Sequence, residues 1–236
     1  ISAESGISTF RDSDGLWKEY DFEDVCTSGC LVDNRDETIK FYDKRRQELH
    51  DKEPNYAHKV LAELKSKYKN DIAIITQNVD NLFEKAGMAN EDIIHLHGFL
   101  TKVECEKCGL AYDIGYKKID DSYNGKCPTC HSRKVRPFIV MFGEIAPFYK
   151  AFYNELNDCE FLVVIGTSGE VINTDSFVVH IKNSILNNLE PSDAIYDELY
   201  SKVLYKPATQ AIDEIAQDIS AFLSPSESTL SEENLK

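Results

Sequence analysis

The sequence predicts an α/β fold with a doubly wound parallel sheet and a smaller added lobe. Two apolar runs end abruptly in polar residues: residues 72–75 are followed by the polar segment 76–80, and residues 93–96 are followed by His97. Buried parallel strands have this pattern, because they deliver polar side chains to the carboxyl edge of the sheet, where ligands bind. Segments with a helical period alternate with these strands, which is the order expected of a doubly wound sheet.

Apolar spacing and capping residues predict the other elements. Three helices are expected at residues 36–50, 54–69 and 81–86. Pro54 would lie in the first turn of the second helix, and Gly87 would cap the third. Three further buried strands are expected at residues 138–142, 161–165 and 185–189.

The C-terminal part contains one more helix. Pro207 is placed to open it. Its apolar residues form a single stripe that predicts packing against the core: Ala211, Ile212, Ile215, Ile219, Phe222 and Leu223. From Ser224 onward Ser, Glu and Asn dominate, and this composition predicts a disordered tail.

Four cysteines have the spacing of a zinc site. Cys105 and Cys108 form one CxxC pair, Cys127 and Cys130 form another, and 18 residues separate the two pairs. Two such pairs can close a tetrahedron of thiolates around one zinc ion. Four protein ligands leave no open position for chemistry, so the zinc is expected to be structural. The alternative is two disulfides or a redox-active CxxC pair.

Composition limits the class of protein. A chain of 236 residues with a hydrophobic fraction of 42% suits one compact domain with an inserted module. It contains no apolar run of 18 residues and no signal-peptide pattern, so nothing suggests a membrane or export. The net charge of −15 argues against nucleic-acid binding and suits cationic, lysine-bearing substrates. Zinc thiolates and the spare cysteines Cys26, Cys30 and Cys159 suit a reducing, cytoplasmic location.

Two histidines are candidates for a general base. An unperturbed pKa near 6.5 suits a histidine for proton transfer at neutral pH. Alternation places His95 and His97 on the same face of an ideal strand, so spacing does not choose between them. A histidine at a strand end can also be purely structural.

Nine stretches match the motifs of one protein family, in the family's order and over nearly the whole chain: residues 1–11, 14–17, 41–46, 76–80, 97–98, 140–144, 166–168, 188–192 and 206–210. Together with the cysteine spacing, these motifs make the chain resemble a sirtuin, an NAD-dependent protein-lysine deacylase. Within that family it resembles the branch that includes the bacterial enzymes and the animal mitochondrial desuccinylase.

The resemblance implies a doubly wound parallel Rossmann-like sheet with a smaller zinc-binding and helical lobe. The NAD-binding domain would comprise residues 1–35, 71–103 and 137–223. The smaller lobe would comprise a helical insertion at 36–70 and a zinc-binding module at 104–136, with residues 224–236 as the tail. In the family a short strand and a Gly-Ala-Gly turn precede the residue that corresponds to Ile1, so we expect further residues before Ile1.

The resemblance also implies the chemistry. NAD would be a consumed co-substrate: the acyl-lysine carbonyl oxygen attacks the ribose carbon as nicotinamide leaves. The family's His-Gly pair favours His97 over His95 as the base that acts on a ribose hydroxyl. The products would be free lysine, nicotinamide and acyl-ADP-ribose.

The NAD contacts that the resemblance implies are Ala3, Thr9, Phe10, Arg11, Trp17, Gln77, Asn78, Val79, Asp80, Gly166, Thr167, Ser168, Asn188, Leu189, Glu190 and Ala208. Gln77 and Asn78 would hold the nicotinamide ribose, and Val79 and Asp80 the carboxamide. Judged without the family, both 77–78 and 166–168 could be plain turns after strands.

Two segments would clasp the substrate peptide as an added strand, through Val140, Phe142, Gly143, Glu144, Gly169 and Val171. Met141 replaces a Trp that is common in the family, and it should still offer an apolar wall.

Tyr42 and Arg45 are the candidates for reading the acyl group. Their i, i+3 spacing puts them on one face of a helix. In the resembling branch, this pair binds the carboxylate of succinyl- or malonyl-lysine, through a guanidinium and a hydroxyl. Acetyl groups would be accepted as well. On local grounds this basic run is more often a solvated helix face, and Arg46 is expected to point elsewhere.

Two other functions remain open at this stage. One is a mono-ADP-ribosyltransferase built on the same scaffold, and the other is a non-catalytic zinc-ribbon adaptor. The sequence does not indicate the oligomeric state or the protein substrates.

Overall fold

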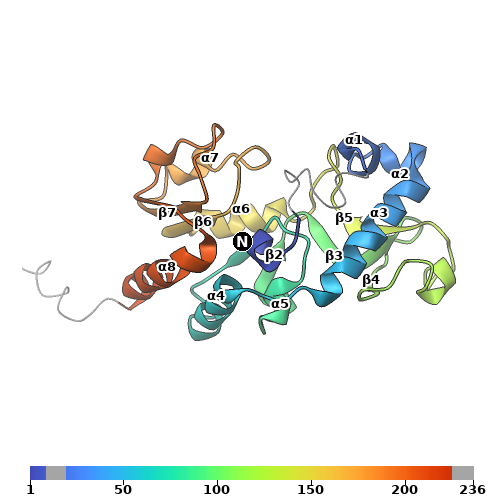
Figure 1. Ribbon diagram of the computed structural model, residues 1–236, viewed down its shortest axis with the longest axis horizontal. Helices are drawn as coiled ribbons and strands as arrows, with labels where there is room; N and C mark the ends of the chain where they lie inside the picture. Colours follow the sequence, from blue (N-terminus) through green and yellow to red (C-terminus); the bar gives the residue numbers. More distant parts are fainter. Residues whose placement is uncertain (9–19, 225–236) are drawn as a thin grey trace, which may run out of the picture. The chain divides into compact units, whose positions relative to one another are not determined.

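A computed structural model describes residues 1–8 and 20–224 (Figure 1). The α-helices are α1 (Phe22–Val25), α2 (Cys30–Asp33), α3 (Arg35–Glu48), α4 (Tyr56–Lys67), α5 (Leu82–Lys85), α6 (Tyr149–Asn157), α7 (Asp175–Val178) and α8 (Ala208–Leu223). Short 3₁₀ helices are η1 (Ser2–Ser5), η3 (Leu49–Asp51), η4 (Asn90–Asp92), η5 (Tyr123–Gly125) and η6 (Asp197–Leu199). The strands are β1 (Ile74–Thr76), β2 (Ile93–His95), β3 (Gly98–Cys105), β4 (Ala111–Asp113), β5 (Val135–Ile139), β6 (Phe161–Ile165), β7 (Asn183–Asn188) and β8 (Lys202–Tyr205).

The chain divides into two compact units. Unit 1 contains Ile1, Asn55–Ala73 and Tyr153–Lys236, and unit 2 contains Ser2–Pro54 and Ile74–Phe152. None of the helices in the described part is long and apolar enough to span a membrane.

Unit 1 is built on a parallel sheet in the order β6-β7-β8. Helices α4 and α8 pack together in this unit, where the Tyr56 hydroxyl donates to Asp213 Oδ1 at 2.7 Å. The apolar stripe of α8 is buried at its N-terminal half, at Ala211, Ile212 and Ile215. The loops that follow β6 and β7 leave the same edge of the sheet because the strands are parallel.

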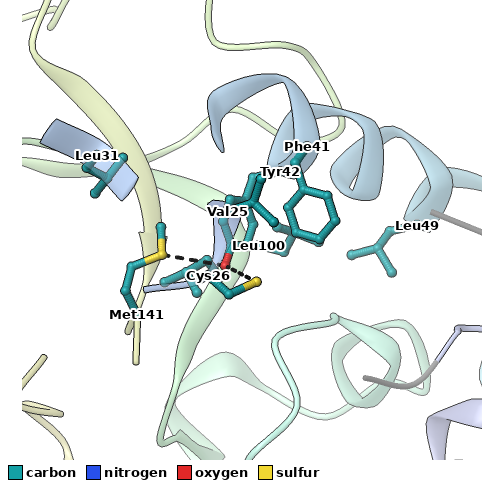
Figure 2. Close-up of a cluster of buried hydrophobic side chains, with 9 residues drawn as sticks. Val25, Cys26, Leu31, Phe41, Tyr42, Leu49, Leu100 and Met141 are labelled. Carbon is teal, nitrogen blue, oxygen red and sulfur yellow. Dashed lines mark hydrogen bonds between the residues drawn. The ribbon is translucent and has the colours of Figure 1, made fainter. Parts of the chain in front are cut away.

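Unit 2 contains two sheets. Strands β1 and β2 pair in parallel and end together, with Thr76 opposite His95. Strands β4, β3 and β5 form an antiparallel sheet that carries the cysteines. A buried cluster that includes Phe41, Tyr42, Leu100 and Met141 joins α3 to β3 and to the segment after β5 (Figure 2).

The predicted helices are confirmed at α3, α4, α5 and α8, with shifts of a few residues at their ends. Helix α4 begins at Tyr56, because the Asn55 side chain accepts hydrogen bonds from the backbone N–H of Ala57 and His58 and so acts as the N-cap. Gly87 follows α5 with φ 99°, and its N–H donates to Glu84 O, as expected of a helix-ending glycine.

Two predictions about local structure need correction. The strand expected at 138–142 is β5, which ends at Ile139 and runs antiparallel to β3. His97 does not continue strand β2 beside His95, because β2 ends at His95 and His97 lies in the turn that leads into β3. Gly98 then makes that turn possible: a Cβ atom there would lie 2.1 Å from Phe138 O.

Arg46, which we expected only to point elsewhere than Arg45, is buried. Its side chain is 0% exposed, and its Nε donates to Leu100 O at 2.7 Å. It also pairs with Asp43, whose carboxylate accepts the N–H of Ile119. This buried pair therefore fastens α3 to β3 and to the cysteine-rich module. Removing one partner of such a pair typically costs about 3–5 kcal/mol.

Candidate active site and zinc site

The four predicted cysteines converge in unit 2. The sulfur atoms of Cys105, Cys108, Cys127 and Cys130 all lie within 4.8 Å of one another. The shortest separations that join the two CxxC pairs are 3.5 Å and 3.6 Å, which is too long for a disulfide of about 2.05 Å. Tetrahedral zinc at about 2.3 Å from each sulfur needs separations of roughly this size. The donor set therefore fits one structural zinc, and the disulfide alternative is wrong.

The backbone folds into a tight turn at each pair of cysteines. The N–H of Gly109 returns to Cys105 O at 2.8 Å, and the N–H of His131 returns to Cys127 O at 3.0 Å. Each CxxC pair is thus a tight turn. Hydrogen bonds from the backbone N–H of Cys130 and of Thr129 lower the pKa of the Cys127 thiol to about 7, against the opposing effect of burial. Although a backbone hydrogen bond at Leu110 opposes the shift, burial and contacts with the other three thiols raise the pKa of Cys108 to about 12. A thiol that ionises near neutral pH is a ready metal ligand.

His97 is oriented by a single backbone contact. Its Nδ1 lies 3.1 Å from Gln77 O. A carbonyl oxygen can only accept, so Nδ1 carries the proton and the neutral ring keeps its lone pair on Nε2. Burial lowers the pKa of His97 below its ordinary value, although the hydrogen bond to Gln77 opposes the shift. The ring is therefore neutral at pH 7 and can accept a proton at Nε2.

The His95 side chain contacts Glu84 and Phe99. Its Nε2 lies 2.8 Å from Glu84 Oε1, and its ring packs against Phe99 with the centroids 4.5 Å apart. Its side chain is 9% exposed. The structure thus distinguishes two histidines that spacing alone did not: His95 pairs with a carboxylate, and His97 bonds to a backbone carbonyl.

Residues 77–80 follow β1 and are held in unit 2. The N–H of Asn78 donates to Thr76 Oγ1 at 3.0 Å, and the Asn78 amide donates to Ser2 Oγ at 2.9 Å. The carbonyl oxygen of Val79 accepts the N–H of Leu100. The Asp80 carboxylate accepts the N–H of Leu82, and burial raises its pKa.

The segment 140–144 joins the His97 turn to the region of Cys26. The N–H of Val140 donates to His97 O at 2.9 Å, and the N–H of Phe142 donates to Cys26 O at 2.9 Å. Glu144 stabilises this segment: its carboxylate forms a two-pronged ion pair with Arg136 and accepts the N–H of Met141. The Phe142 side chain is 47% exposed.

Tyr42 and Arg45 lie on α3 as predicted. Tyr42 is buried, and Arg45 is half-buried with its guanidinium 5.7 Å from the Phe41 ring centroid. Burial lowers the pKa of Arg45, and the electrostatic effects of Tyr42 and Cys26 oppose that shift. The guanidinium, the phenol and the Cys26 thiol therefore share one neighbourhood.

Several of the other predicted NAD contacts lie at the carboxyl edge of the unit 1 sheet. Gly166 follows β6 with φ 66°, and a Cβ there would come within 2.9 Å of Ile1 N, so the turn requires glycine. Both ends of the Asn188 side-chain amide pair with the Thr167 backbone. Ser168 O accepts the Ser192 hydroxyl at 2.7 Å. Small residues and a bare backbone at a strand end fit a phosphate-bearing ligand.

The other predicted residues lie in several elements. Ala3 lies exposed in η1, Leu189 and Glu190 are exposed after β7, and Ala208 is buried at the start of α8. In unit 1, Gly169 donates its N–H to Thr167 Oγ1, and Val171 is 51% exposed. Thr9, Phe10, Arg11 and Trp17 lie outside the described residues.

Comparison with known proteins identifies the family. The model of the Sir2 family matches residues 1–173. The chain belongs to the Sir2 family. A Campylobacter jejuni protein named NAD-dependent protein deacylase is 43% identical over 94% of this chain and 93% of its own length. A Helicobacter hepaticus protein of the same name is 40% identical over 94% of each chain.

Solved sirtuin structures agree with this membership. A Sir2 homologue in complex with ADP-ribose has a TM-score of 0.80 and 30% identity, over 96% of this chain and 90% of its own. A Sir2 homologue in complex with NAD also has a TM-score of 0.80 and 30% identity, over 95% and 87%. The sirtuin chain described here therefore has the Rossmann-like α/β fold. It is an NAD-dependent enzyme, and its four cysteines fit one structural zinc.

Two sulfur atoms contact Tyr42, one of the predicted site residues. Cys26 was expected to be a spare thiol and Met141 an apolar wall, but both sulfur atoms contact the Tyr42 hydroxyl. No spacing rule links positions 26, 42 and 141, so only the tertiary structure reveals this contact.

Proposed function

We propose that this sirtuin removes acyl groups from protein lysines, and that it prefers succinyl and malonyl groups over acetyl. The observation that supports the preference is Arg45, a half-buried cation on α3 that interacts electrostatically with Tyr42. A guanidinium that has lost part of its hydration is stabilised by a carboxylate that can bind it bidentately. A Sir2 protein solved with a deacetylated p53 peptide and 3′-O-acetyl ADP-ribose supports acyl-lysine peptides as the substrate class.

In the proposed mechanism, His97 is the general base. NAD supplies the electrophilic ribose carbon and the ribose hydroxyl that takes over the acyl group. His97 would accept the proton of that hydroxyl at Nε2, while its Nδ1–H stays bonded to Gln77 O. The segment 140–144, which is bonded to the His97 turn, would clasp the substrate peptide as an added strand. Backbone pairing reads few side chains, so we expect loose sequence selectivity.

The preference is tested by replacing the cation. In Arg45→Met, we expect the ratio of desuccinylation to deacetylation, each as kcat/KM, to fall by about 10- to 150-fold. A hydrogen bond to a charged group is worth about 1.5–3 kcal/mol, and an acetyl group offers Arg45 no charge. Tyr42→Phe should lower the ratio less, because it removes a neutral donor.

Lys40→Met is the matched control, since it removes an exposed cation from the same helix. Arg46 cannot serve as a control, because its side chain is buried in an ion pair. Equal losses on both substrates in Arg45→Met would contradict the proposal, since Arg45 would then support the fold or the peptide.

The protonation state of His97 predicts the pH dependence. Because burial lowers the pKa of His97, the neutral form should persist below pH 6.5 and be lost only as the pH falls further. The acidic limb of kcat/KM for deacylation should therefore have its midpoint below the ordinary histidine value of about 6.5. A midpoint at or above that value, measured on a stable enzyme, would contradict a neutral buried base.

Transfer of ADP-ribose to protein is the alternative reaction. Labelled NAD distinguishes the two, because deacylation carries the label into acyl-ADP-ribose and the alternative carries it into protein.

A further inference from the structure

The hydroxyl of Tyr42 has two sulfur atoms as its hydrogen-bond acceptors. Tyr42 is 3% exposed, and its hydroxyl lies 3.6 Å from Cys26 Sγ and 3.6 Å from Met141 Sδ (Figure 2). Both sulfurs are themselves buried, with Cys26 and Met141 each 1% exposed. We propose that Cys26 and Met141 are positioning residues that keep the Tyr42 proton on weak acceptors, so that an acyl carboxylate can take it at little cost. This inference rests on the proposed preference for carboxylated acyl groups.

To bind a carboxylate, the Tyr42 hydroxyl must first give up its present hydrogen-bond acceptors. A thiol or thioether sulfur is a weak acceptor, whereas a carboxylate oxygen is charged and forms short, strong bonds with hydroxyl donors. If the resting partner were an amide or hydroxyl oxygen, carboxylate binding would first break a good hydrogen bond. With a sulfur partner the exchange loses little, and most of the new bond contributes to discrimination.

The protonation states are consistent with this role. Burial raises the pKa of Tyr42 well above its ordinary value, so the phenol stays a donor at neutral pH. Burial also raises the pKa of the Cys26 thiol to about 11, so this thiol brings no negative charge that would repel a carboxylate. The charges that act on this hydroxyl are the cations Arg45 and Arg136, and both would favour a carboxylate.

The backbone fixes both sulfurs in place. The N–H of Phe142 donates to Cys26 O at 2.9 Å, and the N–H of Ser28 donates to Phe142 O at 2.8 Å. Cys26 and Met141 therefore lie on two segments that are bonded to each other. Because Val140 is bonded to His97 O, the same segment connects the sulfurs to the proposed base.

The test varies acceptor strength at position 141. Glutamine has about the length of methionine and places a strong oxygen acceptor near the hydroxyl, whereas leucine places none. We expect Met141→Gln to lower the succinyl-to-acetyl ratio of kcat/KM by about 2- to 10-fold, mainly through KM for the succinyl peptide, since a neutral hydrogen bond is worth about 0.5–1.5 kcal/mol. Met141→Leu should leave a higher ratio than Met141→Gln does, because leucine offers the Tyr42 hydroxyl no competing oxygen.

The same substitutions in a Tyr42→Phe background show whether the effect passes through the hydroxyl. There Met141→Gln and Met141→Leu should give equal ratios. Thermal unfolding of each variant identifies those that lose the fold, and the ratio itself cancels losses shared by both substrates. Equal ratios for Met141→Gln and Met141→Leu with Tyr42 present would overturn the inference. A wild-type enzyme without succinyl preference, unchanged by Tyr42→Phe, would overturn the proposed function instead.

Discussion

His97→Ala should lower kcat/KM for deacylation by about 10²–10⁴-fold, the usual effect of removing a general base. The fold should survive, because His97 is only half-buried, lies in a turn, and donates its Nδ1 proton to one backbone carbonyl. NAD binding, measured by calorimetry, should be retained, since the proposed role of His97 is to accept a proton. Deacylation rates and thermal unfolding of the same preparation would check both expectations.

His95→Ala is the informative comparison. It removes a buried ring that pairs with Glu84, so we expect a lower melting temperature and a much smaller effect on the rate of the folded enzyme. His180→Ala, which removes an exposed histidine of unit 1, should change neither. An active His97→Ala enzyme together with a folded but inactive His95→Ala enzyme would show that the base was assigned to the wrong histidine.

Local signals in the sequence predicted the elements that carry most of the candidate site. The polar residues after β1 and β2, the long helix α3 and the paired CxxC turns all depend on short-range patterns, and the structure contains each of them. A strand end or a metal-binding turn can be recognised because the residues that define it are close in sequence.

Tertiary contacts decided the rest. Arg45 and Arg46 are adjacent and chemically identical, yet Arg46 is buried because its partners include Leu100 O and Lys117 O, which are 54 and 71 residues further along the chain. The antiparallel pairing of β5 with β3 and the sulfur contacts of Tyr42 are also long-range. The helical period could not show that Arg46, and not Arg45, would be fully buried.

Loss of zinc should unfold the module that holds α3. We expect Cys105→Ala to abolish stoichiometric zinc binding and to lower the melting temperature strongly or cause aggregation. Structural zinc binding by small motifs contributes on the order of 10 kcal/mol, and Cys105 is also part of the module's buried core with Val103 and Val135. Zinc content by mass spectrometry and thermal unfolding are the measurements.

Loss of zinc should also affect helix α3, because α3 is anchored to the zinc-binding module. Arg35 donates to Glu106 Oε2 at 2.6 Å and to Val135 O at 2.9 Å, at one end of the helix. Farther along, Asp43 accepts the N–H of Ile119. Chelation of zinc should therefore reduce desuccinylation through Tyr42 and Arg45, even though the four-cysteine site leaves no open position for catalysis.

Cys159→Ala is the matched control, because Cys159 is a half-buried thiol of unit 1 and lies outside the four-cysteine cluster. It should keep one zinc per chain and nearly the wild-type melting temperature. If chelated enzyme kept its full stability and activity, zinc would not support the fold. If chelation lowered stability but left the succinyl-to-acetyl ratio intact in the surviving folded enzyme, α3 would hold its position without the zinc-binding module.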